Sequence, residues 1–122
     1  NGNYASQYRL PGTFCPIADF DLVKHAAEEC EKLGVHFMVG NILSSDTFYD
    51  DANSGMEWAK MGVLGVEMES AALYCNAARA GKKALCICTV SDSFVYPEEN
   101  TTAEERQTSF TKMMEVALEI AE

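Results

Sequence analysis

The run "KALCICTVSD" at residues 83–92 is the feature that most limits what this chain can fold into. Its continuous apolar and β-branched stretch ends in polar residues, a pattern typical of a strand buried on both faces of a parallel sheet. Two shorter apolar runs, at residues 35–43 and 63–68, also predict strands. Because segments with helical spacing alternate with these runs, we predict an α/β fold with a mostly parallel or mixed central sheet flanked by helices.

Apolar residues at helical spacing and helix-ending glycines predict the flanking helices. We expect Gly34 to end the first helix, and Thr102 with Glu105 to form a capping box at the start of the last. The predicted helices are residues 17–33, 56–62, 70–80 and the segment from 102 to the C-terminal region. The expected buried faces are Val23, Ala26, Ala27, Cys30 and Leu33 in the first helix, and Phe110, Met113, Met114, Ala117 and Leu118 in the last.

The charge balance of the chain excludes several classes of partner. Of its 122 residues 19 are acidic and 9 basic, which gives a formal net charge of -10. Nucleic acids and anionic membranes attract clustered lysine and arginine, so neither is expected as the main partner. No apolar stretch approaches the roughly 20 residues that span a bilayer, and no secretory signal opens the chain.

The cysteines predict a reduced, cytoplasmic protein without a metal centre. Five are present, an odd number, and none is in C-x-x-C spacing. Cys86 and Cys88 are two residues apart in an apolar run, so they should point to the same face of a strand. Neither His25 nor His36 has cysteine or carboxylate neighbours at metal-ligand spacing, and both are interpreted as structural.

Polar residues follow each of the three predicted strands, and we interpret them as one candidate site. Parallel α/β sheets bind ligands in crevices outside the carboxyl ends of their strands, so the residues that follow these strands should lie close together. The residues in these positions are Asp46 with Phe48, Glu67 with Glu69, and Ser91 with Asp92.

The two glutamates suit a ligand with paired hydroxyl groups. Glu67 and Glu69 share one face of an extended backbone, and ionised carboxylates accept hydrogen bonds only. They therefore match the 2′- and 3′-hydroxyls of a ribose. The alternative is that Glu69 merely favours the N-terminus of the helix that begins near Ser70.

Asp92 is the candidate general acid. Burial would raise the pKa of its carboxyl group and allow it to donate a proton. The alternative is a cap or turn former, the common role of an aspartate at a strand end. Arg106 could swing toward this acid, although a surface role is also open, and Phe48 could stack on a flat base or simply belong to the core.

Four stretches together resemble one enzyme family. The segments "VGNILSSDTFY", "GVLGVEMESAALY", "ALCICTVSD" and "TTAEERQTSF" resemble, in order and spacing, the C-terminal half of the hexameric bacterial-type purine nucleoside phosphorylases. The likeness extends from about Ala18 to the end of the chain. It implies a nucleoside-phosphorylase three-layer fold and the reaction of a purine (deoxy)ribonucleoside with phosphate to give free purine and (deoxy)ribose 1-phosphate. Inorganic phosphate would be a co-substrate, no cofactor would be needed, and a homo-oligomer, by resemblance a hexamer, would form.

The resemblance also implies a role for individual residues. Asp92 would protonate the purine at N7 while Arg106 moves in to assist, and Met68 with Glu69 would hold the ribose hydroxyls. General acid catalysis of this kind contributes about 10²–10⁴-fold. The remaining positions that the resemblance places near the base and sugar are Phe48, Val66, Glu67 and Ser91.

The sequence departs from the family pattern in two places. Ser93 stands where relatives commonly have histidine, and the loop that follows is about one residue longer. The family's phosphate-binding glycine-rich segment and its arginines lie in an N-terminal half that has no counterpart here. We therefore expect residues 1–122 to be the C-terminal portion of a domain, inactive alone and dependent on that missing half.

Two other functions remain open. The related nucleosidases that hydrolyse methylthioadenosine and adenosylhomocysteine share the "EME" and "SD" elements and use water in place of phosphate. A truncated module that binds nucleoside without turnover is the other alternative.

Overall fold

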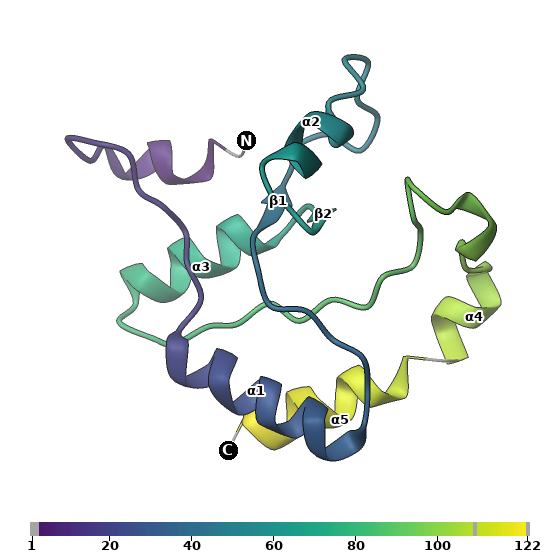
Figure 1. Cartoon of the computed structure of the whole chain (residues 1–122). Coiled ribbons are helices and arrows are strands. Elements are labelled where there is room, and N and C mark those ends of the chain that lie inside the picture. The colour runs from purple at the N-terminus through teal and green to yellow at the C-terminus, as the bar shows by residue number, and fades with distance from the viewer. Residues whose placement is uncertain (1–2, 109, 122) are drawn as a thin grey trace.

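The computed structural model describes residues 3–108 and 110–121 as short helices with a small parallel sheet (Figure 1). The elements in chain order are η1 (Tyr4–Tyr8), α1 (Phe20–Leu33), β1 (Ile42–Ser44), α2 (Gly55–Lys60), β2 (Gly65–Glu67), α3 (Ser70–Arg79), η2 (Pro97–Glu99), α4 (Ala103–Thr108) and α5 (Thr111–Ile120).

Strands β1 and β2 pair in parallel, as the sequence pattern predicted. The register places Ile42 opposite Gly65 and Ser44 opposite Glu67, so both strands end at the same edge. Helix α2 and the loop before it connect the two strands (Figure 1). This arrangement confirms an α/β fold, although each strand is shorter than its predicted run at 35–43 or 63–68.

The prediction of a strand at residues 83–92 is wrong for the described part of the chain. This segment joins no sheet there, and Val90 near its end is 72% exposed. A buried strand requires a hydrogen-bonded neighbour on each side, and β1 and β2 pair only with each other within the described residues. The apolar pattern of residues 83–92 is therefore typical of a buried strand, but the described residues supply no strand that pairs with it.

Helices nevertheless flank this segment on two sides, which keeps a layered order (Figure 1). On the α3 side, the backbone N–H of Cys86 donates to the Tyr74 hydroxyl at 2.9 Å. On the side of α1 and α5, the Asp19 N–H donates to the Ala84 carbonyl at 2.9 Å, and the Thr89 hydroxyl lies 3.3 Å from the Met113 sulfur. The segment thus occupies the middle layer of a partial three-layer fold.

Helix α1 begins and ends through local capping. The Asp19 carboxylate accepts a hydrogen bond from the Leu22 N–H at 3.1 Å, and this fixes the start three residues after the predicted position. At the other end Gly34 adopts a left-handed conformation with φ 66°, and its N–H bonds back to the last turn. The predicted stop at Gly34 is confirmed, because glycine takes this conformation without strain.

The predicted last helix is two helices, α4 and α5, and the predicted buried face of the second is mostly wrong. The Thr102–Glu105 capping box does form at the start of α4, with hydrogen bonds of 2.6 and 3.2 Å. In α5, however, Val116 is the buried residue at 2% exposure, whereas Leu118 is 73% exposed. Met113 and Ile120, at helical spacing from Val116, are half-buried, so the buried face of α5 is rotated from the predicted one.

The packing of α5 on α1 forms much of the small core. Val116 is fully buried, and Ala26 of α1 is also buried. Among the residues whose burial the structure describes, Ser70 and Cys75 of α3 are also buried. Truncating a side chain at such a site lowers the stability of the protein, because the transfer free energy of the removed atoms is lost and a cavity remains.

We predict that Val116→Ala lowers the free energy of unfolding by about 2 kcal/mol, because it removes two buried methyl groups. Urea denaturation followed by circular dichroism measures this change. Leu118→Ala on the exposed side of α5 is the matched control and should alter stability by less than about 0.5 kcal/mol. Equal losses in both variants would contradict the assigned packing of α5.

Candidate active site

Glu67 is the structural centre of the candidate site. It ends β2, and its carboxylate accepts hydrogen bonds from the backbone N–H groups of Glu69 at 2.7 Å and Ser70 at 2.6 Å, and from the Ser70 hydroxyl. These donors belong to the first turn of α3, where backbone N–H groups lack intrahelical partners. Glu67 therefore anchors the N-terminus of α3 to the end of β2.

Two serines complete this network, and sequence reasoning missed both. Ser44 ends β1, accepts a hydrogen bond from the Ala71 N–H at 3.2 Å, and bonds through its side chain to Glu67. Ser70 is 4% exposed, and its hydroxyl donates to Glu67. The sequence signal that could have identified them is their position, Ser44 at the end of a predicted strand and Ser70 at the start of a predicted helix. We call Ser44, Glu67 and Ser70 the strand-end network.

The network determines the ionisation of Glu67. Burial raises the pKa of this carboxyl group, but hydrogen bonds from the Ser70 hydroxyl, the two α3 amides and Ser44 outweigh burial. The net effect holds the pKa of Glu67 below its ordinary value of 4.5. The carboxylate is therefore charged at neutral pH, and hydrogen bonds from this chain already engage both of its oxygens.

Glu69 is placed differently from Glu67. It occupies the N-cap position of α3, yet its side chain makes no capping hydrogen bond and is exposed. Its carboxylate accepts only a long hydrogen bond, 3.3 Å, from the Met68 N–H among the bonds that the structure shows. The helix-terminus role considered for Glu69 therefore belongs to Glu67, and Val66, Met68 and Glu69 present exposed surface beside it.

Phe48 is not a core residue. Its ring is 78% exposed in the loop after β1 and meets the ring of Tyr49 edge-on, with centroids 5.1 Å apart. An exposed aromatic pair beyond a strand end is compatible with contact to a flat ligand. Asp46 lies in the same loop and is also exposed.

Asp92 is exposed, so the burial expected for a proton donor is not present in this chain. The segment that carries it makes defined contacts all the same. The Ser91 hydroxyl donates to the Asp92 carboxylate at 2.9 Å, and Thr101 donates to the Ser91 carbonyl through both its N–H and its hydroxyl, each at 2.7 Å. Asp92 thus begins a loop whose two ends are joined.

Ser93 organises that loop through three hydrogen bonds. Its hydroxyl oxygen accepts from the N–H groups of Val95 and Tyr96 at 3.2 and 2.9 Å, and its own N–H donates to the Asn100 side chain at 2.6 Å. The Phe94 ring of this loop lies beside Gly55 at the start of α2. A Cβ atom added at Gly55 would be 3.6 Å from that ring. The Asp92 loop is therefore next to the start of α2.

Arg106 lies in α4, and its side chain lies outside the described residues. The approach to Asp92 that the resemblance implies thus stays a prediction. Among residues 3–108 and 110–121, no group of three or more histidine, cysteine or acidic side chains could hold a metal ion. No helix in these same ranges is long and apolar enough to cross a bilayer.

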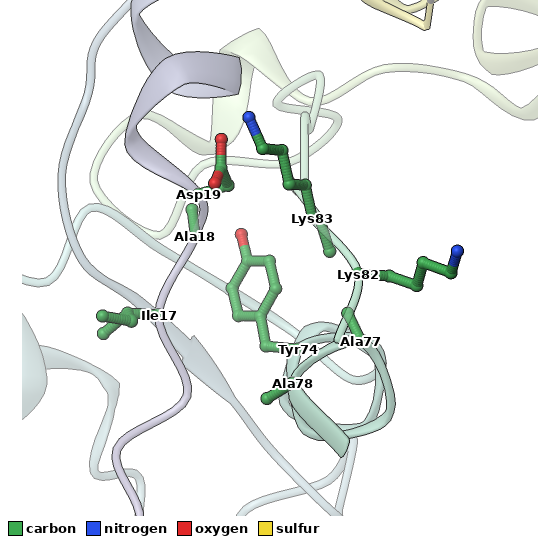
Figure 2. Close-up of a pocket in the computed structure, with 9 residues that line it drawn as sticks. Ile17, Ala18, Asp19, Tyr74, Ala77, Ala78, Lys82 and Lys83 are labelled. Carbon is green, nitrogen blue, oxygen red and sulfur yellow. The ribbon is translucent and has the colours of Figure 1, made fainter. Parts of the chain in front are cut away.

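Two surface cavities are formed by other residues. One, of about 180 Å³, lies between the start of α1 and the end of α3, and Figure 2 shows the Tyr74 ring directed into it toward Asp19 and Lys83. The second, of about 200 Å³, includes Tyr8 and Arg79, whose guanidinium lies 5.5 Å from the Tyr8 ring centroid. Neither cavity is lined by a predicted site residue. Neither of these two cavities is therefore shared by Asp92 and Glu69.

Comparison with known proteins identifies the class of protein that these elements belong to. The family model of the phosphorylase superfamily matches residues 1–122, so the chain belongs to that superfamily. Its curated relatives include DeoD-type purine nucleoside phosphorylases from Clostridium novyi (strain NT), 56% identical over 110 residues, and Bacillus subtilis (strain 168), 53% identical over 105 residues. These matches cover 89% and 86% of this chain but 47% and 45% of the relatives, so the chain spans about half their length.

We predict that Glu67→Gln lowers the free energy of unfolding at pH 7 by about 1 kcal/mol, the typical contribution of a helix-capping carboxylate. The folded-state pKa of Glu67 is depressed, so its stabilisation is complete above the ordinary value of 4.5 and is lost as the pH falls through the lower folded-state value. Urea denaturation from pH 7 to pH 3 should therefore show less acid destabilisation in the variant. Glu69→Gln is the matched control, and an equal effect of the two substitutions would contradict the assigned cap.

Proposed function

We propose that these residues carry the base- and ribose-binding part of a site for phosphorolysis of purine (deoxy)ribonucleosides. The observation that carries this proposal is the identity of 53–56% to enzymes named purine nucleoside phosphorylase over nearly all of the chain. In the reaction, the bond between sugar C1′ and purine N9 breaks and a phosphate oxygen bonds to C1′. The products are free purine and (deoxy)ribose 1-phosphate.

Glu67 and Glu69 have different roles at the ribose site. Glu67 is fully engaged by the strand-end network, so its role is to fix the turn between β2 and α3. That turn presents Met68 and Glu69 to the ligand, with Val66 beside them. The Glu69 carboxylate then accepts a hydrogen bond from a ribose hydroxyl, an interaction that contributes about 1.5–3 kcal/mol when the acceptor is charged. Precise placement of the sugar brings C1′ into line with the attacking phosphate.

Asp92 supplies the proton for the leaving group. A purine leaves poorly as an anion, and protonation at N7 allows it to leave as a neutral molecule. The hydrogen bond from Ser91 orients the Asp92 carboxyl group, and Phe48 flanks the base. Covering of Asp92 by ligand and by further polypeptide provides the burial that favours its protonated form. Arg106 assists this donation.

The phosphate-binding site belongs to polypeptide outside these residues. Residues 1–122 act as the C-terminal portion of one domain. Anion sites of this kind combine glycine-rich backbone with arginine side chains. Arg79 instead lies over the Tyr8 ring, and Arg9 ends a 3₁₀ turn on the N-terminal side of α1. Phosphate is the co-substrate, no cofactor takes part, and the assembled enzyme is a cytoplasmic homo-oligomer, a hexamer by family resemblance.

The purified 122-residue chain should release no measurable purine from inosine and phosphate. A chimera that joins it to the N-terminal part of the Clostridium novyi relative should release hypoxanthine only when phosphate is present. A coupled assay for hypoxanthine measures both. Release without phosphate would indicate a hydrolase, and binding of inosine without turnover in the chimera would indicate a non-catalytic module.

In the same chimera, Asp92→Asn should lower the rate of phosphorolysis by about 10²–10⁴-fold, the usual contribution of a general acid. Asp51→Asn, in the exposed loop after β1, is the matched control and should leave the rate within about twofold. An unchanged rate in Asp92→Asn would exclude this residue as the proton donor.

Glu69→Ala in the chimera should raise KM about tenfold, because the loss of one charged hydrogen bond costs at least about 1.5 kcal/mol. Glu67→Gln should instead reduce thermal stability, with a smaller change in KM. Steady-state kinetics and thermal denaturation of the two variants separate these roles. The reverse pattern would assign the sugar contact to Glu67.

A further inference from the structure

The Ser44 hydroxyl lies where β1, β2 and α3 meet. Ser44 is the last residue of β1 and stands opposite Glu67 in the parallel register. Its oxygen accepts a hydrogen bond from the Ala71 N–H at 3.2 Å, and its side chain bonds to the Glu67 carboxylate. The next backbone amide, the N–H of Ser45, donates to the Glu67 carbonyl at 2.8 Å. One serine therefore connects the ends of both strands with the first turn of α3.

The partners of the two serine hydroxyls fix how each hydroxyl is oriented. A hydroxyl has one proton to donate, and an ionised carboxylate can only accept. Because the Ala71 N–H is itself a donor, the Ser44 proton is directed at the Glu67 carboxylate. The Ser70 hydroxyl donates to the same carboxylate from the start of α3, and Ser70 is 4% exposed. Both hydroxyls are thus held by groups within this chain.

Met68 and Glu69 are the two residues between these fixed points. Glu67 precedes them and Ser70 follows them, and the backbone N–H groups of Glu69 and Ser70 both donate to the Glu67 carboxylate. A segment of two residues between fixed ends keeps little backbone freedom. The position of the Glu69 backbone is therefore set by the strand-end network, whatever its side chain contacts.

We propose that Ser44 and Ser70 are positioning residues for the ribose contact of Glu69, an inference that rests on the function proposed above. Neither hydroxyl touches the substrate, because both are engaged within the strand-end network. They hold the turn so that the Glu69 carboxylate meets the ribose hydroxyls, whereas the base is held by other residues. Such positioning matters because a small misplacement of the reacting atoms slows a reaction strongly.

The experiment separates sugar binding from base binding in the chimera with the N-terminal part of the Clostridium novyi relative. Inosine carries a ribose and hypoxanthine does not, so the ratio of the inosine KM to the hypoxanthine inhibition constant reports the ribose contact. Ser44→Ala and Ser70→Ala should each raise this ratio about three- to fivefold, the effect of one ordinary hydrogen bond. Ser44→Thr keeps the hydroxyl and should restore the ratio. An unchanged ratio in both alanine variants would overturn the proposal.

A Glu69→Ala background shows whether the serines act through Glu69. In that background Ser44→Ala should change the ratio by less than about twofold, because residues that act through one contact are not additive. A merely structural role would persist after the loss of Glu69. An undiminished effect of Ser44→Ala would therefore also overturn the proposal.

Ser45→Ala is the matched control. The Ser45 hydroxyl donates to the Thr47 carbonyl at 2.8 Å and lies outside the strand-end network, so the ratio should stay within about twofold. An increase equal to that of Ser44→Ala would contradict the assignment. Absence of turnover in the unsubstituted chimera would contradict the proposed function and this inference with it. Normal turnover with an unchanged ratio in the alanine variants would contradict this inference alone.

Discussion

The hydrogen bonds that tie the end of β2 to the start of α3 are the interaction on which the candidate site depends. Glu67 lies at the edge where both parallel strands end, and it accepts two amides of the following helix. Ser44 extends this connection to β1 through the Ala71 N–H. One carboxylate therefore sets the relative positions of two strands and a helix, and the direction in which Met68 and Glu69 point follows from it.

This arrangement explains why two glutamates that are two residues apart have different roles. Helix N-termini carry unsatisfied N–H groups and a partial positive charge, and an acceptor close to them is held there. Glu67 accepts those bonds, whereas Glu69 occupies the N-cap position without a capping bond from its side chain, which is exposed. A pair of identical residues thus supplies one structural group and one group available to a ligand. Sequence spacing alone does not distinguish the two.

Local signals were sufficient to predict most of the helices. The Gly34 stop and the Thr102–Glu105 capping box depend on residues within a few positions of each other, and both form, whereas the cap at Asp19 was not predicted. The parallel direction of β1 and β2 agrees with the mostly parallel or mixed sheet expected from the alternation of apolar runs and helical segments. The buried face of α5 could not be predicted in the same way. It depends on where the chain breaks after α4 and on the side of α5 against which α1 packs.

The strand-like run at 83–92 shows the limit of prediction from pattern. Its residues indicate burial on both faces, but a strand exists only when neighbours supply the ladder, and this depends on polypeptide far away in sequence. The same reason applies to Asp92, whose exposure follows from its place at the end of this run. The residues expected to act on the ligand stay a prediction, because the described residues do not form the enclosure that a ligand site at this segment requires.

The course of this middle segment has a consequence for how ligands and neighbouring polypeptide interact. Cys86, Thr89 and Ser91 attach it to α3, α5 and the loop after Asp92, so its arrangement is shared by elements on both sides. A nucleoside that contacts Asp92 and a strand that pairs with the same backbone would each favour one arrangement of it. Thermodynamic linkage then requires that each partner change the other's affinity by the same factor, which is an increase when both favour the same arrangement. Such coupling would link the proposed ligand contact at Asp92 to strand pairing without any direct contact between the two partners.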